Sequence, residues 1–357
     1  MKREPIERLQ TQAVDPILVR AVRTQDEPAW QRFVDECPEA TFFHRFGWKR
    51  VLERALGHHA HYLLAERDGR PVGVLPLAQV RSRLFGHSLG SLPFCVYGGA
   101  ACTDPDARPR LHRAAVDLAQ QLQVDHLELR NRAAAEPQWP RQDLYVTFRK
   151  TMDADVDANL AAIPRKQRAM VRKGMKAGLR SLVERDLRHF FPLYADNVHR
   201  HGTPALSRRY FEALRSEFGE ACEVLTVFDP HGAPVSSVLS FYFRDEVLPY
   251  YAGDHARARD LAANDFKYWE LMRMSCERGC RVFDYGRSKR GSGSFDFKKN
   301  WGFAPEPLHY EYRLVRGGRV PENNPSNPRY RLFIAMWRRL PRPLANLLGP
   351  RIVRSLG

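Results

Sequence analysis

The order of sequence motifs in the first half of the chain is repeated in the second half. Residues 42–57 and residues 205–219 each have the pattern of a helix that ends at a glycine, Gly57 or Gly219. Each helix is followed by two apolar runs around a turn that carries a glycine and then Pro-Val, which indicates a β-hairpin. A chain duplicated in this way is expected to fold as two similar units.

The later part of each copy also follows one order. Tyr97-Gly98-Gly99 in the first copy and Tyr251-Ala252-Gly253 in the second precede a polar stretch, a helix and a strand. These helices and strands are expected at 108–123 and 126–129, and at 261–279 and 281–284. The repeated order of helix, hairpin, strand, helix and strand predicts an α/β (α+β) fold with a mixed sheet in each copy.

Length and charge bound the class of protein. The chain has 357 residues, enough for two domains, and 43% of them are apolar, so each domain can bury a core. Its formal net charge of +16 attracts polyanions such as RNA, an anionic membrane or a phosphorylated substrate, without selecting one of them. DNA is not an expected partner.

The cysteines and histidines indicate no metal site. The six cysteines are scattered, Cys276 and Cys280 are four apart rather than in a CxxC pair, and the 13 histidines show no zinc-type spacing. We therefore expect reduced thiols in a cytoplasmic protein. The N-terminal residues lack the apolar core of a signal peptide, and no window approaches the roughly 18 apolar residues of a membrane span.

The stretch from Asp284 to Phe303 carries the most functional residue types, and it follows a strand-like apolar run at 281–283. Its glycines allow the backbone to approach a ligand closely. The glycines are Gly286, Gly291 and Gly293, the cations are Arg287, Lys289, Arg290, Lys298 and Lys299, and the anchoring aromatics are Phe295, Phe297, Trp301 and Phe303. This mixture predicts a ligand-facing loop; the alternative is a solvated basic hairpin.

Two short patterns in this stretch resemble the Fem-type peptidyltransferases, the FemAB/FemX family. Residues 297–303 fit the family's Phe-Lys-Lys-x-aromatic-Gly-Phe pattern, and residues 284–288 match the Asp-aromatic-Gly-Arg-Ser pattern of the branch associated with exosortase (XrtA)/PEP-CTERM systems. The resemblance implies two fused GNAT-like domains and transfer of an acyl group, often an aminoacyl group from tRNA, onto an amine. The expected units are an N-terminal GNAT-like domain at 17–150, a C-terminal one at 151–316, and a linker with a basic amphipathic tail at 317–357.

The resemblance also implies roles for residues of this stretch. By its position after Phe297, Lys298 is expected to stabilise the oxyanion that forms in acyl transfer. Phe297 is expected to lie beside the substrate, and Lys299 to be a secondary phosphate contact. From its residue type, Arg287 is expected to hold a carboxylate or phosphate in a bidentate fork. Asp284 either acts as a base or orients Arg287.

A second group of cations lies in residues 161–176, which have a helical pattern with Pro164 in the first turn. Arg165, Arg168, Arg172 and Lys176 recur at spacings of three and four and so share one face. Arg168 and Arg172 are the expected contacts of a phosphate-bearing substrate or of tRNA. The alternative is a solvated linker helix.

The sequence leaves the acyl donor open. The acetyl-CoA loop of ordinary GNAT enzymes, Arg or Gln followed by x-x-Gly-x-Gly or Ala, would need Arg or Gln before Gly291 and Gly293, where this chain has Ser288. Aminoacyl-tRNA and acyl-CoA are therefore alternative co-substrates, and no other cofactor is expected. On the acceptor side, Tyr251 either lines the pocket or packs in the core.

The tail at 329–357 combines large apolar residues with seven arginines and no acidic residue, after a turn-rich linker at 317–328. Tyr330, Phe333, Trp337 and Leu340 share one helical face. This pattern is typical of an interfacial membrane helix, and equally of a tail packed on the protein with its arginines in solvent. Peripheral contact with the inner membrane surface would suit an anionic or lipid-linked precursor as substrate.

Three functions fit these features. The first is a FemAB-like acyltransferase that acts on an amine of a cell-envelope or exopolysaccharide precursor. The second is an acyl-CoA-dependent N-acyltransferase in exopolysaccharide synthesis. The third is a non-catalytic RNA- or membrane-binding assembly protein, which would leave the Phe297-Lys298 pattern unexplained.

Overall fold

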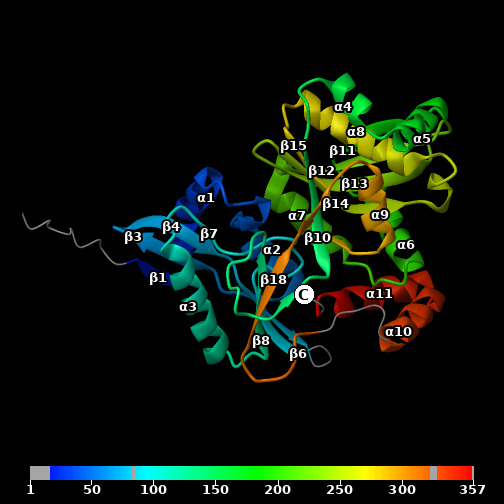
Figure 1. Cartoon of the computed structure of the whole chain (residues 1–357). Helices are drawn as coiled ribbons and strands as arrows, with labels where there is room; N and C mark the ends of the chain where they lie inside the picture. The colour runs from blue at the N-terminus through cyan, green and yellow to red at the C-terminus, as the bar shows by residue number, and fades with distance from the viewer. Residues whose placement is uncertain (1–16, 83–85, 322–327, 356–357) are drawn as a thin grey trace, which may run out of the picture.

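The computed structural model in Figure 1 describes residues 17–82, 86–321 and 328–355. Strands and helices of the first half of the chain gather on one side of the molecule, and those of the second half on the other (Figure 1). The two sides are joined by long strands that run between them.

The first side contains a four-stranded sheet in the order β1-β3-β4-β7 and a six-stranded sheet in the order β2-β5-β6-β8-β18-β9. Strand β6 is parallel to β8 while β5 is antiparallel to β6, so the larger sheet is mixed, as predicted. Helix α3 packs across β3 and β4, and α1 contacts β4. The bounds are β1 Leu18–Ala21, α1 Glu27–Glu36, β2 His59–Ala60, β3 Leu63–Arg67, β4 Arg70–Leu75, β5 Ala78–Ser82, β6 Gly86–Gly90, β7 Ala101–Cys102, α3 Ala107–Gln121, β8 His126–Asn131, β9 Arg141–Gln142 and β18 His309–Leu314.

The second side is built on an eight-stranded sheet in the order β11-β12-β13-β14-β15-β10-β16, with β17 paired to β10. Helix α6 packs on β13 and β14, α8 contacts β12, β13 and β14, and α5 lies against α8. The strands are β10 Tyr145–Thr151, β11 Arg180–Glu184, β12 Cys222–Phe228, β13 Pro234–Phe243, β14 Glu246–Asp254, β15 Val282–Asp284, β16 Ser288–Lys289 and β17 Pro305–Pro307. The helices are α4 Val156–Ala162, α5 Arg165–Lys176, α6 Phe190–Arg200, α7 Arg208–Phe218, α8 Ala263–Glu277 and α9 Gly293–Asn300, with short turns at Gly219–Ala221 and Ala256–Ala258. A further short turn, Thr24–Asp26, precedes α1 on the first side.

The two sides exchange a strand. Strand β10 precedes the second half in sequence, yet it pairs with β15, β16 and β17 in the second sheet. Strand β18 lies near the end of the second half, yet it pairs with β8 and β9 in the six-stranded sheet of the first side. The boundary expected between residues 150 and 151 therefore falls inside β10, and residues 309–314 belong by hydrogen bonding to the first side.

The duplicated elements are present with one local difference. Both predicted hairpins form, as β3–β4 and as β12–β13. The helix expected at 42–57 is broken into a 3-10 turn η2 (Phe42–His44), α2 (Gly47–Val51) and a π-turn η3 (Leu52–Leu56) that ends at Gly57 with φ of 73°. Arg45 has an extended backbone between the first two pieces, and the indole of Trp30 hydrogen-bonds the free carbonyl of His44 at 2.7 Å.

One hydrophobic core spans both halves. Phe42 stacks on Phe241 of β13 with ring centroids 4.3 Å apart, and Trp48 packs on Phe218 of α7 at 5.3 Å. All four side chains are buried. Burial of this aromatic cluster therefore stabilises the contact between the two halves.

The C-terminal tail forms two helices, α10 (Pro328–Arg339) and α11 (Arg342–Val353), which pack on α6. The side chain of Tyr330 and residues 322–327 lie outside the described part of the chain. Among the described residues, no helix is long and apolar enough to cross a bilayer.

Candidate functional site

The loop predicted to face a ligand is a turn followed by a helix. Strand β15 ends at Asp284, Gly286 turns the chain with φ of 65°, and β16 follows at once. The hydroxyl of Ser292 then accepts a hydrogen bond from the amide of Phe295 and caps α9. The segment is therefore neither a continuous loop nor a basic hairpin, because the cap starts a helix that carries Lys298 back beneath the turn.

Lys298 is buried beneath this turn. Its Nζ donates hydrogen bonds to the backbone carbonyls of Tyr285, Gly286 and Arg287, at 2.7, 3.0 and 3.1 Å. Burial lowers the pKa of Lys298 to about 7, and the nearby Asp284 carboxylate opposes this shift. All three protons of the ammonium are used, so Lys298 fixes the shape of the turn. Stabilisation of an oxyanion by Lys298 stays a prediction, because the substrate would have to replace one of the three backbone carbonyls as a hydrogen-bond acceptor.

Asp284 is fully buried and its carboxylate is saturated with donors. It accepts from the hydroxyl of Tyr97 at 3.0 Å, from Arg149 at 2.5 Å and from the amide of Gly286 at 2.7 Å. Arg149 also pairs with Glu246 on β14. In the part of the chain that the structure describes, Arg287 is not among the hydrogen-bond partners of Asp284. The geometry therefore makes Asp284 the anchor of the turn.

Arg287 is exposed and lies against tyrosine rings. Its guanidinium is 4.5 Å from the ring centroid of Tyr145 and 5.8 Å from that of Tyr310, and it donates a 3.3 Å hydrogen bond to the Tyr310 hydroxyl. No carboxylate among the described residues forms an ion pair with it. A guanidinium that lies over tyrosine rings and has no carboxylate partner among the described residues is suited to bind a carboxylate or phosphate.

The other predicted contacts are dispersed. Tyr251 exchanges a 2.9 Å hydrogen bond with Tyr210, and Phe297 packs against Tyr268. Lys299 is exposed on α9. On α5, Arg168 donates to the carbonyl of Ala161 at 2.6 Å and Arg172 is exposed.

The two arginines of α5 do not join the turn at Arg287. Helix α5 packs on α8, where Gly174 meets Phe266 so closely that an added Cβ would lie 2.7 Å from it. Within the described residues, no hydrogen bond or ion pair links Arg168 or Arg172 to the residues around Lys298. Within the described residues, the structure thus brings together Lys298, Asp284 and Arg287 and shows no direct contact between them and the α5 cations.

Strand β14 separates from β15 after a short parallel pairing. Their register contains only Glu246 with Val282 and Val247 with Phe283. Strand β14 continues to Asp254, and its pairing with β13 shifts register between Leu239 and Ser240. The divergence leaves one side of β14, beyond these pairs, without a β15 partner. Such a strand edge can pair with the amide groups of an extended ligand.

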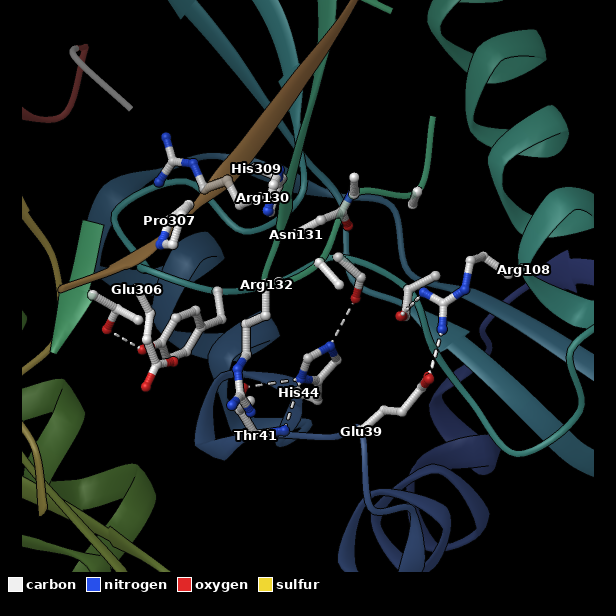
Figure 2. A pocket seen from close by; sticks show the side chains of 18 residues that line it. Glu39, Thr41, His44, Arg108, Arg130, Asn131, Arg132, Glu306, Pro307 and His309 are labelled. Atoms are coloured by element: carbon white, nitrogen blue, oxygen red, sulfur yellow. Dashed lines mark hydrogen bonds and ion pairs between the residues drawn. The ribbon is translucent and has the colours of Figure 1, made fainter. Parts of the chain in front are cut away.

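A cavity of about 690 Å³ lies on the other side of the Asp284 network. Tyr97 and Thr147 form part of its wall, and their hydroxyl groups are 2.5 Å apart. Figure 2 shows the charged lining, with Arg132 extending toward His44 and Thr41, and Arg108 paired with Glu39 at 2.7 Å. Tyr97 and Thr147 therefore connect the wall of the cavity to Asp284, which anchors the turn that carries Arg287.

His44 and Arg132 line the cavity together with the charged side chains of Glu39, Arg108, Arg130 and Glu306. The imidazole of His44 contacts the carbonyl of Gly99 and the amide of Thr41, which fixes the proton on Nε2. Burial lowers the pKa of His44 to about 4, so the ring is neutral at physiological pH. Arg132 is exposed and its guanidinium lies 5.5 Å from the ring of Tyr97; no ion pair of Arg132 is found in the described structure. Arg132 is thus available to an anion.

Sequence reasoning missed this cavity. Tyr97-Gly98-Gly99 was recognisable only as a landmark of the duplication, and Arg132 lies in a segment without a motif. The local signal was the pair of glycines: an added Cβ at Gly99 would lie 1.8 Å from Asn131, and one at Gly98 would lie 2.5 Å from the carbonyl of Ser91. Glycines required by close packing mark a constrained site.

The comparisons with known proteins define the class of the fold. Residues 165–299 match the family model of the GNAT acetyltransferase domain. The structure is similar to a tandem GNAT protein from the clavulanic acid biosynthesis pathway, with a TM-score of 0.54 and 13% identity over 85% of this chain and 100% of that one. Residues 165–299 thus match a GNAT acetyltransferase domain and the chain has a GNAT-like mixed α/β fold, so the predicted fold class is confirmed.

A more specific similarity is to the crystal structure of FemX. The TM-score is 0.64 at 15% identity, and the alignment covers 89% of this chain and 100% of FemX. The C-terminal domain of a putative lysylphosphatidylglycerol synthetase from Agrobacterium fabrum is also similar, with a TM-score of 0.55 and 13% identity over 82% of this chain and 92% of that one. No curated protein sequence matches the chain. The resemblance to FemX inferred from two short patterns is thus supported at the level of the fold.

Proposed function

We propose that this protein transfers an acyl group, and in particular an aminoacyl group, to an amine of a cell-envelope or exopolysaccharide precursor. The observation that carries the proposal is the divergence of β14 from β15 inside the segment that matches the GNAT acetyltransferase domain. The aminoacyl group of the donor would lie along the free side of β14, where its amine and carbonyl would hydrogen-bond the unpaired backbone groups, and the rest of the donor would extend toward Arg287.

One feature favours an aminoacyl donor over acyl-CoA. The connection from β14 to α8, residues 255–262, contains no glycine, so its backbone offers no glycine-rich cradle for a pyrophosphate. Arg287 is exposed and without a carboxylate partner in the described structure, and it would hold the terminal phosphate or the carboxylate of a substrate. The acyl-CoA-dependent reading stays the alternative within the same fold.

The proposed reaction converts an ester into an amide. The acceptor amine attacks the donor carbonyl, a tetrahedral oxyanion forms, and the ester C–O bond breaks as the amine proton passes to the leaving oxygen. Lys298 would stabilise the oxyanion when the donor carbonyl replaces one of its three backbone acceptors. Asp284 would keep the turn in shape rather than remove the proton, because its oxygens already accept several hydrogen bonds.

The acceptor would occupy the cavity in front of Tyr97. Its volume of about 690 Å³ lies in the range of small-molecule sites. Arg132 would pair with an anionic group of the acceptor, whereas His44 is neutral and would add no charge. This assignment fits an anionic precursor, whether free or lipid-linked.

The test is a titration of the purified protein with aminoacyl-tRNA, uncharged tRNA, acetyl-CoA and longer acyl-CoAs at near-physiological salt. We expect saturable binding that depends on the aminoacyl group and is lost in Arg287→Ala but not in Arg290→Ala, an exposed arginine of the same turn. Tight binding of acyl-CoA would favour the alternative donor. Equal binding of charged and uncharged tRNA that vanishes with salt, without turnover, would favour the non-catalytic reading.

The catalytic role of Lys298 and the association with exosortase systems each have a separate test. A folded Lys298→Ala variant with full transfer activity would remove Lys298 from the chemistry. The association with exosortase systems rests on the pattern at 284–288, and a gene neighbourhood without an exosortase would remove it.

A further inference from the structure

The tail helices α10 and α11 dock on the protein with only one face. Trp337 and Ala345 are buried, at 5% and 3% exposure. Close approach fixes the docking: an added Cβ at Gly349 would lie 3.1 Å from the backbone of Ala205, and one at Gly202 would lie 2.5 Å from Ile334. His199 and the carbonyl of Leu340 are hydrogen-bonded at 3.0 Å, which holds the connection between the two helices.

The opposite face of α11 is apolar and faces solvent. Leu344, Leu347 and Leu348 are 47%, 61% and 39% exposed, and their spacing of three and four residues places them on one stripe. Arg351 continues this stripe one turn later and is exposed. On α10, Met336 is 64% exposed. Most large apolar side chains of a folded protein are buried, so an exposed cluster marks a contact surface.

The charged residues of the two tail helices are all positive. Among the tail side chains that the structure describes, the exposed arginines are Arg338, Arg339, Arg342, Arg351 and Arg354, and residues 328–355 contain no acidic residue. Arg342 forms an ion pair with Asp196 of α6, and the other four have no ion pair within the described structure. Long arginine side chains can lie along apolar surface while their charge reaches a headgroup layer.

We infer that α10 and α11 form an interfacial anchor that binds the surface of an anionic lipid bilayer. The leucines of α11 would enter the boundary of the acyl chains, and the arginines would bind lipid phosphates. Two other occupants fit less well. A second copy of the chain would place the same arginines against each other in a symmetric contact. A nucleic acid would use the arginines but leave the leucine stripe in water.

The inference is independent of the proposed function. The docking surface lies on α6, whereas the proposed donor and acceptor sites use β14, Arg287 and the cavity at Tyr97. Two alternatives are expected for the tail. The face that contains Trp337 and Ala345 packs on the protein, and membrane contact is proposed for the face that contains Leu344 and Leu347.

The experiment is co-sedimentation of the full chain with vesicles of phosphatidylcholine alone and of phosphatidylcholine with an equal part of phosphatidylglycerol. We expect binding to the anionic vesicles only. The double variant Leu344→Ser with Leu347→Ser should bind at least about tenfold more weakly. Leu18→Ser with Leu182→Ser is the matched control, because both leucines are similarly exposed, at 61% and 57%, on β1 and β11. This variant should bind like the wild type.

A second pair of variants tests the charge. Arg351→Gln with Arg354→Gln should weaken binding about 30-fold, whereas Arg70→Gln with Arg113→Gln, exposed arginines of the first half, should have little effect. Failure of the full chain to bind anionic vesicles overturns the proposal. Unchanged binding by the leucine variant also overturns the proposal, because it would indicate an electrostatic contact alone. A wild-type protein that is dimeric in light scattering and becomes monomeric in the leucine variant overturns it as well. Donor binding, measured on the same variants, should be unaffected, so a failed anchor is distinguishable from a failed acyltransferase.

Discussion

The hydroxyl of Tyr97 donates a hydrogen bond to the carboxylate of Asp284 at 3.0 Å, and both side chains are buried. The first residue belongs to a loop of the first half of the chain, and the second ends β15 of the second sheet. Burial raises the pKa of Tyr97 well above its usual value, so the phenol remains a donor. The bond connects the wall of the cavity to the turn that carries Arg287.

Tyr97→Phe tests how much this hydrogen bond contributes to stability. We expect it to lower the free energy of unfolding by about 1–3 kcal/mol, because Asp284 and Thr147 would each lose a buried partner. Tyr62→Phe is the control, since the Tyr62 hydroxyl is buried without a hydrogen-bond partner in the described structure and its removal should be neutral or stabilising. Denaturant unfolding of both variants measures the difference; equal effects would contradict the assignment.

The buried Lys298 gives stability a pH dependence. Its pKa falls from 10.5 to about 7 on folding because burial disfavours the cation. Between these pH values the unfolded chain binds the extra proton, so this group makes the free energy of unfolding rise with pH, by up to about 1.4 kcal/mol per unit.

We therefore expect Lys298→Met to flatten the stability profile between about pH 7 and pH 10.5 relative to the wild type. Denaturant midpoints at several pH values in this window provide the measurement. Parallel profiles would show that the three backbone carbonyls keep the lysine protonated throughout.

Arg132→Ala tests the proposed anion contact in the cavity. We expect the affinity for a phosphate- or carboxylate-bearing acceptor to fall by about 1.5–3 kcal/mol, the range for hydrogen bonds to charged groups. Stability should change by less than about 0.5 kcal/mol, because Arg132 is exposed. Isothermal titration with the acceptor, with Arg113→Ala as an exposed control on α3, provides the measurement, and equal affinities of the two variants would exclude Arg132 from the site.

Gly253→Ala should disrupt the packing of α6 on β14. An added Cβ would lie 2.3 Å from the amide nitrogen of Tyr194, and a backbone atom cannot move aside as a flexible side chain can. We expect a loss of about 3 kcal/mol or more in the free energy of unfolding. Gly293→Ala, where nothing lies within 4 Å, should be tolerated, and thermal unfolding of both variants distinguishes them.

The sequence predicts those parts of the fold that have a local pattern. The hairpins, α3, α8 and β15 follow from periodicity and turn residues, since these signals depend on neighbours in sequence. The pairing of β18 with β8 does not, because no local pattern specifies a partner 180 residues away, the separation between Asn131 and Glu311.

The same distinction applies to the site. Lys298, Asp284 and Arg287 were identified from one contiguous stretch, and the structure brings them together. The partners of Asp284 lie elsewhere, on Tyr97, Thr147 and Arg149, so its anchoring role was not visible in the sequence. Arg168 and Arg172 share a helical face as expected, but that face belongs to a helix that packs on α8.

The exchange of β10 and β18 also limits how the protein is completed on the ribosome. In the six-stranded sheet, β18 lies beside β8. This pair cannot form until β18 has left the exit tunnel, well after β8 has been synthesised. At translation rates of about 5–20 residues per second, β8 then waits on the order of 10–40 s with an unpaired edge. A nascent chain of this design needs protection of that edge, so its folding yield should depend on chaperone capacity and on the speed of synthesis.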